Sequence, residues 1–326
     1  MNASESKSFI LVLIFSLGLS PSYSTPLLHT KGNFMKNKEK LQLPTGPLRY
    51  TLTNDFLFKA FLQKNEKALR GLLCALLSMK NEDIKTITIL NPIEEGASFD
   101  AKMLILDIKL LMNTNRIINI EMQVADFGNW EERSLTYLCR AFDQLRTGED
   151  YKLVKQTIHI SILNYTPKNF PEKLYLDYYF YNKKWEHTYS DKLSLRMLQL
   201  NQLGNLEDER ENPELYYWAQ LFKATTWEEI GMLAEKNEAI SDGIVTLKKL
   251  SEDEKLQMQL EALEDYRRNM ASIEEKGRQE GIQLGIQNLL ETYKEFGVSI
   301  EEAESRITEK FSISQDSAKE LVAKFW

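Results

Sequence analysis

Two apolar runs separated by four polar residues constrain the fold of this chain more than any other feature. Residues 103–112 and 117–124 are rich in isoleucine and leucine, and residues 113–116 between them read Asn-Thr-Asn-Arg. Apolar, β-branched runs of this length on either side of a short polar segment are typical of a β-hairpin. We therefore expect a sheet that contains this hairpin.

Helix-like and strand-like segments alternate around the hairpin. Apolar residues recur at helical spacing in three segments, of which Asn54 or Thr53 can cap the first and Gly148 can close the last. The predicted helices cover residues 55–62, 67–79 and 130–146. The other predicted strands cover residues 84–90, 157–163 and 174–181. This order predicts an α/β fold in which helices flank a mixed central sheet.

After residue 201 the pattern becomes helical throughout. Two short helices are predicted near the end of the chain, where Ser299 and Ser314 can cap them. The longer predicted helices cover residues 214–222, 227–235, 238–250, 252–280 and 282–296. The expected parts of the chain are a lead-in over residues 35–50, a domain over residues 51–200 and an α-helical C-terminal region over residues 201–326.

The C-terminal region is acidic and carries regularly spaced glycines. Residues 201–326 contain 15 Lys/Arg and 27 Asp/Glu, a balance typical of solvated helix faces. Gly277, Gly281 and Gly285 recur every four residues beside charged residues, which excludes a membrane span. A thin helix face lets another helix approach closely, so a homo-oligomer formed through these helices is one interpretation. No contact with a membrane is expected.

The first 34 residues leave two interpretations open. Residues 8–20 form an apolar run before Pro21, which is typical of a secretory signal and is short for a membrane span. Residues 1–7, before this run, contain one Lys and one Glu, so they make only a weak version of the positively charged segment with which a secretory signal begins. The alternative is that translation begins at Met35 and that residues 1–34 are a mis-started extension.

Cysteine and histidine are too few to build a zinc or disulfide framework. The chain has two cysteines, which form no CxxC pair, and three histidines. Any metal site in this chain is therefore expected to use carboxylates, which favour Mg²⁺ or Mn²⁺.

The hairpin carries the most concentrated polar set found on otherwise apolar strands. These residues are Asp107 and Lys109 on the first run, and Asn119, Glu121 and Gln123 on the second. Residues two apart share one face of a strand. With a three-residue loop over 113–115, residue 112 pairs with 116 and Asp107 lies opposite Glu121, about 5 Å apart at Cβ.

The length of the loop decides between two interpretations of these acids. A four-residue loop would set Asp107 opposite Met122 and separate the carboxylates, whereas Asn115 tolerates the left-handed conformation that a three-residue loop requires. Two adjacent carboxylates repel each other unless a divalent cation neutralises them. The alternative is a solvated strand face with an ordinary cross-strand pair of Lys109 and Glu121.

Six landmarks, in order along the chain, resemble the PD-(D/E)xK nuclease family transposases, the recombination-promoting nucleases. They are residues 54–59 (Asn-Asp-Phe-Leu-Phe-Lys), 89–92 (Ile-Leu-Asn-Pro), 106–109 (Leu-Asp-Ile-Lys), 119–124 (Asn-Ile-Glu-Met-Gln-Val), 132–137 (Glu-Arg-Ser-Leu-Thr-Tyr) and 148–151 (Gly-Glu-Asp-Tyr). Each is weak alone, and the ordered set is specific. The resemblance runs from about residue 51 to about residue 296. It implies a restriction-endonuclease-like core that cleaves DNA with Mg²⁺, or with Mn²⁺ as the alternative ion.

The resemblance also implies roles for individual residues. Asp107 and Glu121 take the places of the two catalytic acids that bind metal, and Gln123 stands where the wider superfamily has Lys. The supporting candidates are Asp55, Lys59 and Lys109, and the candidates for contact with DNA are Arg133 and Tyr137. Their structural alternatives are a helix cap, a surface lysine, and a buried tyrosine under an arginine stem. The chain departs from the family where Lys109 is followed by Leu-Leu-Met instead of the common Ala-x-Asp.

Three functions remain open at this point. The first is an active endonuclease that assists recombination or transposition, and the second is a catalytically degenerate DNA-binding or regulatory relative. The third, a secreted interaction protein, depends wholly on the signal-like start. In the family that this chain resembles, the shared pattern normally begins near the protein terminus, so we expect translation to start at Met35. Because members of that family act on DNA inside the cell, we expect a cytoplasmic protein with DNA as its partner.

Overall fold

The computed structural model of the chain describes residues 43–90, 93–94, 104–105, 108–204 and 206–326. The chain divides into two compact units, of which the first ends at Asp253 and the second begins at Glu254. The first unit contains the sheet, and the second is helical. The expected hairpin and most of the expected helices are present within these residues.

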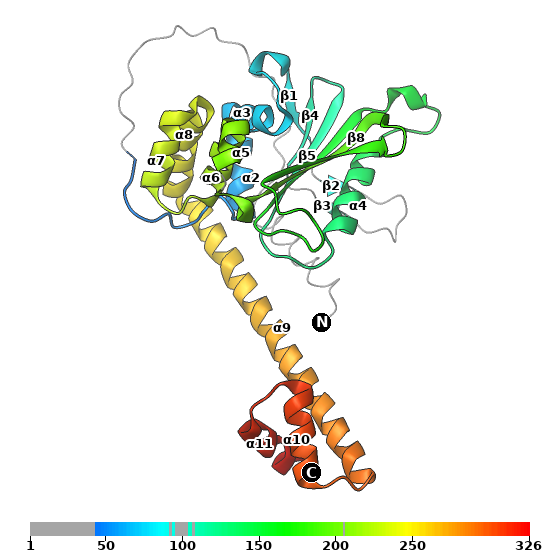
Figure 1. Cartoon of the computed structure of the whole chain (residues 1–326). Helices are drawn as coiled ribbons and strands as arrows, with labels where there is room; N and C mark the ends of the chain where they lie inside the picture. The colour runs from blue at the N-terminus through cyan, green and yellow to red at the C-terminus, as the bar shows by residue number, and fades with distance from the viewer. Residues whose placement is uncertain (1–42, 91–92, 95–103, 106–107, 205) are drawn as a thin grey trace. The chain divides into compact units, whose positions relative to one another are not determined.

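The first unit is built on a six-stranded mixed sheet (Figure 1). Its strands, in order across the sheet, are β1 (Ile87–Ile89), β4 (Ile108–Met112), β5 (Arg116–Gln123), β6 (Gln156–Leu163), β8 (His187–Gln199) and β7 (Tyr175–Asn182). Strand β6 runs parallel to both β5 and β8, and the other neighbours are antiparallel. A separate antiparallel pair joins β2 (Ile93–Glu94) to β3 (Leu104–Ile105). The mixed central sheet confirms the predicted fold class.

Helices cover both faces of this sheet. The helices of the first unit are α2 (Asp55–Lys64), α3 (Glu66–Leu77), α4 (Trp130–Phe142), α5 (Leu206–Glu211), α6 (Pro213–Lys223), α7 (Trp227–Lys236) and α8 (Glu238–Glu252). Short 3₁₀ turns lie at η1 (Asn81–Asp83), η2 (Tyr151–Leu153) and η3 (Leu200–Gln202). Helix α4 lies on one face, while α2 and α3 lie on the other and pack against α6 and α8 (Figure 1).

Side-chain alternation along the strands explains which helix covers which face. Trp130 of α4 packs against Leu163 and Met197, which mark one face of β6 and β8. On the other face the Tyr175 hydroxyl donates to the backbone carbonyl of Leu76, the next-to-last residue of α3. Because side chains alternate along a strand, each central strand contributes to both layers.

The first helix begins as the sequence predicts. The side-chain oxygen of Asn54 accepts hydrogen bonds from the backbone N–H groups of Phe56 and Leu57, each at 3.1 Å. This bonding satisfies two of the donors that the first turn of a helix leaves unpaired. Asn54, of the two predicted candidates, is therefore the cap of α2.

The helix expected over residues 130–146 ends earlier, at Phe142. The Gln144 side chain donates to the carbonyl of Ala141 at 2.6 Å and to Thr157 Oγ1 at 3.2 Å. A side chain that satisfies one of the last carbonyls offers the backbone an alternative to another helical turn. Gly148, predicted to close this helix, therefore lies beyond its end.

The strand predictions differ from the structure in two places. Strand β8 is absent from the sequence prediction, because its first half is exposed and polar and gives little hydrophobic signal. The run predicted over 84–90 forms a strand only at Ile87–Ile89, since η1 precedes it and Ile84 is buried at the turn.

The second unit is one long helix followed by two short ones. Helix α9 (Glu254–Glu295) continues through Gly281, where the sequence predicted a break. A single glycine costs only about 1 kcal/mol relative to alanine, and the pairs Arg278–Glu275 and Lys276–Glu280 support the helix nearby. Helices α10 (Ile300–Phe311) and α11 (Gln315–Phe325) are capped by Ser299 and Ser314, as predicted.

The second unit has its own small core. It consists of residues from all three helices: Ile286, Leu290, Ala303, Ile307, Ala318 and Val322. From the sequence, the helical region is predicted to begin at residue 201, and the compact units divide after Asp253. The helices between these points belong to the first unit, because α6 and α8 pack against α2 and α3. Within the described residues no helix combines the length and the apolar composition that crossing a bilayer requires.

Two glycines in helices give opposite predictions for stability. A Cβ added at Gly71 would lie 2.3 Å from the Cβ of Ala239 in α8, whereas one added at Gly277 would meet nothing within 4 Å. We expect Gly71→Ala to lower the free energy of unfolding by about 1–3 kcal/mol through overpacking. Gly277→Ala should raise it by about 0.5–1 kcal/mol in its own unit. Urea unfolding followed by circular dichroism measures both, and a Gly71→Ala variant as stable as the wild type would contradict the close packing of α3 on α8.

Candidate functional site

A stripe of buried polar side chains crosses the two central strands beneath α4. Its members, all at most 2% exposed, are Asn119 and Glu121 on β5 and Thr157, His159 and Ser161 on β6. The parallel register sets Asn119 beside His159 and Glu121 beside Ser161. The opposite face of the same two strands is apolar, and its buried residues include Ile118, Ile120, Ile158, Ile160 and Ile162. Central strands of this kind are normally apolar on both faces, so the polar stripe requires an explanation.

Glu121 is bound by an arginine from the helix above it. Nε and Nη2 of Arg133 donate to Oε1 of Glu121 at 3.0 and 2.5 Å. The side chain of Glu121 is 3% exposed, and that of Arg133 is 34% exposed. A buried carboxylate without a partner would cost several kcal/mol, and this guanidinium supplies the compensating charge. Glu121 is therefore held in one orientation from the α4 side.

His159 lies on the other side of Glu121 and is fully buried. Its Nε2 is 3.9 Å from Oε2 of Glu121, and its Nδ1 is 2.8 Å from Nδ2 of Asn119. The rings of Trp130 and Tyr137 enclose the imidazole at 6.1 and 6.0 Å between centroids. Burial, and then the charge of Arg133, lower the pKa of His159 to about 3. The imidazole is therefore neutral at pH 7.

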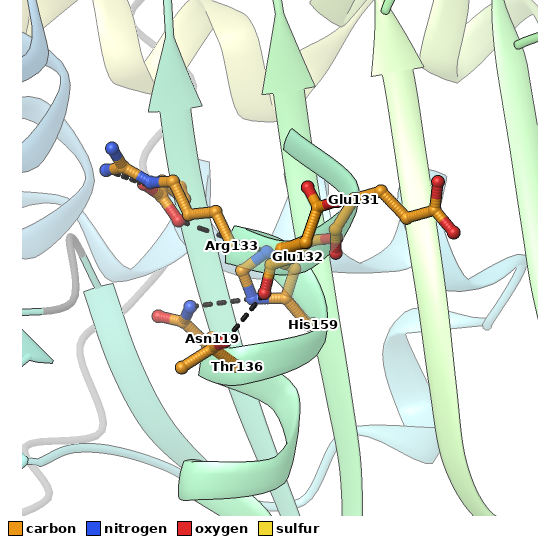
Figure 2. Close-up of polar contacts among 8 residues, drawn as sticks. Asn119, Glu131, Glu132, Arg133, Thr136 and His159 are labelled. Carbon is orange, nitrogen blue, oxygen red and sulfur yellow. Dashed lines mark hydrogen bonds and ion pairs between the residues drawn. The ribbon is translucent and has the colours of Figure 1, made fainter. Parts of the chain in front are cut away.

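Helix α4 brings these groups together because one of its faces is built to cover the stripe. Its buried residues Trp130, Ser134, Tyr137, Leu138 and Ala141 recur at intervals of three or four. Arg133 extends from this face over the rings of Tyr137 and Trp130, at 5.2 and 6.0 Å from their centroids. Figure 2 shows Arg133 leaving the first turns of the helix, with His159 and Asn119 joined beneath it.

The hairpin has the register that the three-residue loop predicts. Met112 pairs with Arg116, and the ladder continues to Ile108 opposite Ile120. The left-handed residues of the loop are Asn113 and Thr114, at φ 51° and 63°, and not Asn115 as predicted. Asn113 adopts this conformation because its side chain accepts from the backbone N–H of Lys85 at 2.6 Å. Asp107 lies outside the described residues.

Three of the predicted site residues lie near the hairpin or on α4. Gln123 ends β5 and donates from Nε2 to the carbonyl of Ala125 at 2.9 Å. Lys109 pairs with Asn119 across the hairpin, so it shares the face on which Glu121 lies. Tyr137 is buried beneath Arg133, in the arrangement given above as its structural alternative.

The other two predicted residues lie on the opposite layer. Asp55 is the first residue of α2, and its carboxylate accepts from the N–H of Phe56 at 2.9 Å. Lys59 lies one turn further along the same helix. Helix α2 packs on the face of the sheet that α4 does not cover, and it contacts β5.

Sequence reasoning missed two residues beside Glu121. His159 belongs to a run in which Thr157, His159 and Ser161 alternate with isoleucine, and this alternation was a signal that the second strand carries polar groups. Tyr165 follows β6, and its pKa is raised by burial first and then by the charges of Asp126 and Glu121. Its hydroxyl is therefore protonated at pH 7, and no pattern in the sequence indicated its place.

Comparison with known proteins agrees with this architecture. A family model described as PD-(D/E)XK nuclease family transposase matches residues 52–277, which is more than half of the chain. Neither the comparison with curated proteins nor the comparison with solved structures finds a match.

The lowered pKa of His159 predicts how stability depends on pH. In the unfolded chain the imidazole has its ordinary pKa of about 6.5, so below that pH the unfolded state binds a proton that the folded state excludes. This contribution is complete above about pH 6.5 and is lost progressively as the pH falls towards 3. From pH 7 to pH 5 the free energy of unfolding should fall by about 2 kcal/mol on this account.

Urea unfolding at pH 7, 6 and 5 tests this expectation. His159→Gln should remove that part of the pH dependence, whereas His187→Gln, a change at an exposed position on β8, should keep it. If the wild type and His159→Gln lose stability equally between pH 7 and pH 5, the buried neutral imidazole is not its cause.

Proposed function

Because the chain belongs to the PD-(D/E)XK nuclease family transposases, we propose that it is a metal-dependent DNA endonuclease that assists recombination or transposition. In this proposal Asp107 and Glu121 bind Mg²⁺, with Mn²⁺ as the alternative ion, and DNA is the substrate. The observation that carries it is Glu121, a carboxylate kept almost fully buried at the carboxyl end of a central strand.

The burial of Glu121 supports a chemical role because it brings little stability. Replacing a buried ion pair by well-packed apolar residues is often neutral or stabilising, so such pairs are weak evidence of a structural purpose. Groups held in this way, beside a histidine whose pKa is strongly lowered, are typical of functional sites. The apolar face of the same strands already supplies the burial that the sheet requires.

The register of the hairpin supports the assignment of Asp107. The described ladder runs from Met112–Arg116 to Ile108–Ile120, and the proposal extends this register by one pair, which would set Asp107 opposite Glu121. The proposal adds that both carboxylates emerge on the face beneath α4. A carboxylate pair on one face is the donor set that Mg²⁺ prefers.

The described residues supply one half of such a metal site. Among them, no group of three or more His, Cys, Asp or Glu side chains lies close enough to hold an ion. Glu121 fits a hard cation, because carboxylate oxygens are the ligands that such ions prefer. The second acid is Asp107, so the ion would be held by Asp107 and Glu121 together.

Each residue of the site then has a distinct task. The bound ion would polarise the scissile phosphate and lower the pKa of the attacking water. Arg133 orients Glu121, and its partly exposed guanidinium gives the site a positive charge that Gln123 does not supply. Gln123 donates to Ala125, so its amide oxygen is the end that accepts a hydrogen bond from the water. Tyr137 supports Arg133, and Lys59, Lys109 and Asp55 are supporting residues.

A second function is favoured by one specific contact. Arg133 supplies a positive charge that compensates Glu121, which is the arrangement expected of a relative that keeps the fold and binds DNA without cleaving it. In either case we propose that the protein acts in the cytoplasm. Self-association through the C-terminal helices remains a prediction.

Plasmid cleavage by the purified protein, with and without Mg²⁺, tests the endonuclease. We expect Asp107→Asn and Glu121→Gln to abolish Mg²⁺-dependent nicking, because each removes a metal ligand. Gln123→Ala should lower the initial rate by about 10²–10⁴-fold, since it misplaces the water without removing the ion. Glu132→Gln, which makes the same change of charge on the exposed first turn of α4, is the matched control and should nick like the wild type.

Melting temperatures must accompany these rates. Glu121→Gln also removes the charge that Arg133 binds, so its loss of activity counts only where the variant remains folded at the assay temperature. A wild type that nicks no supercoiled, linear or single-stranded DNA in Mg²⁺ or Mn²⁺, or an Asp107→Asn variant that nicks equally well, rejects the endonuclease in favour of the degenerate relative.

A further inference from the structure

The mechanism above gives no task to His159, a buried polar residue beside Glu121. His159 is fully buried, and its Nε2 has no hydrogen-bond partner among the residues that the structure describes. That nitrogen lies 3.9 Å from Oε2 of Glu121, whereas the Arg133 hydrogen bonds described above go to Oε1. Buried nitrogens are normally hydrogen-bonded, so the orientation of this one is expected to serve a purpose.

Asn119 determines which ring nitrogen of His159 carries the proton. Its Nδ2 is 2.8 Å from Nδ1 of the imidazole, and an amide nitrogen is only a donor. Nδ1 must therefore accept, which leaves the proton of the neutral ring on Nε2. The N–H group formed in this way lies near the carboxylate oxygen of Glu121.

The opposite tautomer is electrostatically unfavourable at this position. If the amide of Asn119 were rotated so that its oxygen met Nδ1–H, Nε2 would turn a lone pair towards Oε2 of a buried carboxylate. In a dry interior two such acceptors repel each other strongly. The Nε2–H tautomer instead sets a donor beside an anion, with Trp130 and Tyr137 fixing the ring.

We propose that Asn119 fixes His159 as the Nε2–H tautomer, and that His159 is a positioning residue which orients Glu121 from the side opposite Arg133. The carboxylate then lies between a charged donor on α4 and a neutral N–H group on β6 whose nitrogen is 3.9 Å away. The catalytic consequence rests on the proposed function, because Glu121 orients a metal only if the protein is a nuclease. The tautomer of His159 does not depend on the proposed function.

Nuclear magnetic resonance of the full chain labelled with ¹⁵N-histidine tests the tautomer directly. The chain has three histidines, and His159→Gln identifies the signals of His159 by their loss. At pH 7.5 we expect a pyrrole-like nitrogen at Nε2 and a pyridine-like nitrogen at Nδ1. The reverse pattern, or an equal mixture of the two tautomers, overturns the proposal whether or not the protein cleaves DNA.

Variants test the positioning role once cleavage has been measured. His159→Gln keeps an N–H donor close to the position of Nε2, whereas His159→Leu removes it. We expect His159→Leu to lower kcat by about 10–100-fold with KM nearly unchanged, and His159→Gln to recover most of this loss. Asn119→Ala should give mixed tautomers and an intermediate kcat, because Nδ1 loses its donor.

The matched control is Ser194→Ala, which removes a buried hydroxyl from the neighbouring strand β8, on the face that pairs with Ile158 and not on the face of His159. It should keep the wild-type kcat and the Nε2–H signal of His159. If kcat in all these variants simply follows their melting temperatures, His159 is a packing residue and the positioning role is rejected. If the wild type shows the Nε2–H tautomer but no nuclease activity, the proposed function fails while the role of Asn119 stands.

Discussion

The ion pair between Glu121 and Arg133 is the interaction on which the layer beneath α4 depends. Glu121 lies on the strand that joins the antiparallel hairpin to the parallel half of the sheet, where water cannot solvate its charge. A carboxylate in that position requires a cation, and α4 carries it on the same face as the rings that cover the stripe. The position of the helix and the charge of the site are therefore coupled, because α4 supplies both the cover that keeps water from Glu121 and the cation that compensates it.

The two faces of β5 and β6 carry side chains of opposite character, one apolar and one polar. The isoleucines on the face towards α2 and α3 pack like an ordinary core, and that face tolerates no polar group without a partner. The face towards α4 holds an amide and a carboxylate from β5, and an imidazole and two hydroxyls from β6. Because alternation along a strand separates these sets completely, the polar network can be arranged for a reaction without changing the core behind it.

Much of this architecture could be predicted from the sequence, and the failures have physical causes. The hairpin, its three-residue loop and the caps at Asn54, Ser299 and Ser314 follow from local patterns, because turns and caps are decided by a few adjacent residues. Strand β8 escaped prediction, since its first half is exposed and its side chains show no hydrophobic alternation.

The candidate site was predictable only in part, because its contacts join segments far apart in the sequence. Glu121 stood out as an acid on an apolar strand, but nothing local indicated that Arg133, twelve residues later on a helix, would bind it. His159 lies 40 residues from Asn119, and only the parallel pairing of β5 with β6 brings them side by side.

The parallel arrangement of β5, β6 and β8 has a consequence for how this protein can diversify. Three parallel strands end at one edge of the sheet, so the segments that follow them, beginning at Val124, Asn164 and Leu200, all leave from the side where Glu121 and Gln123 lie. Connecting segments accept insertions and substitutions far more readily than the strands they follow. Substitutions or insertions in any of these three segments could therefore change the surroundings of Glu121 without altering the strand that carries it.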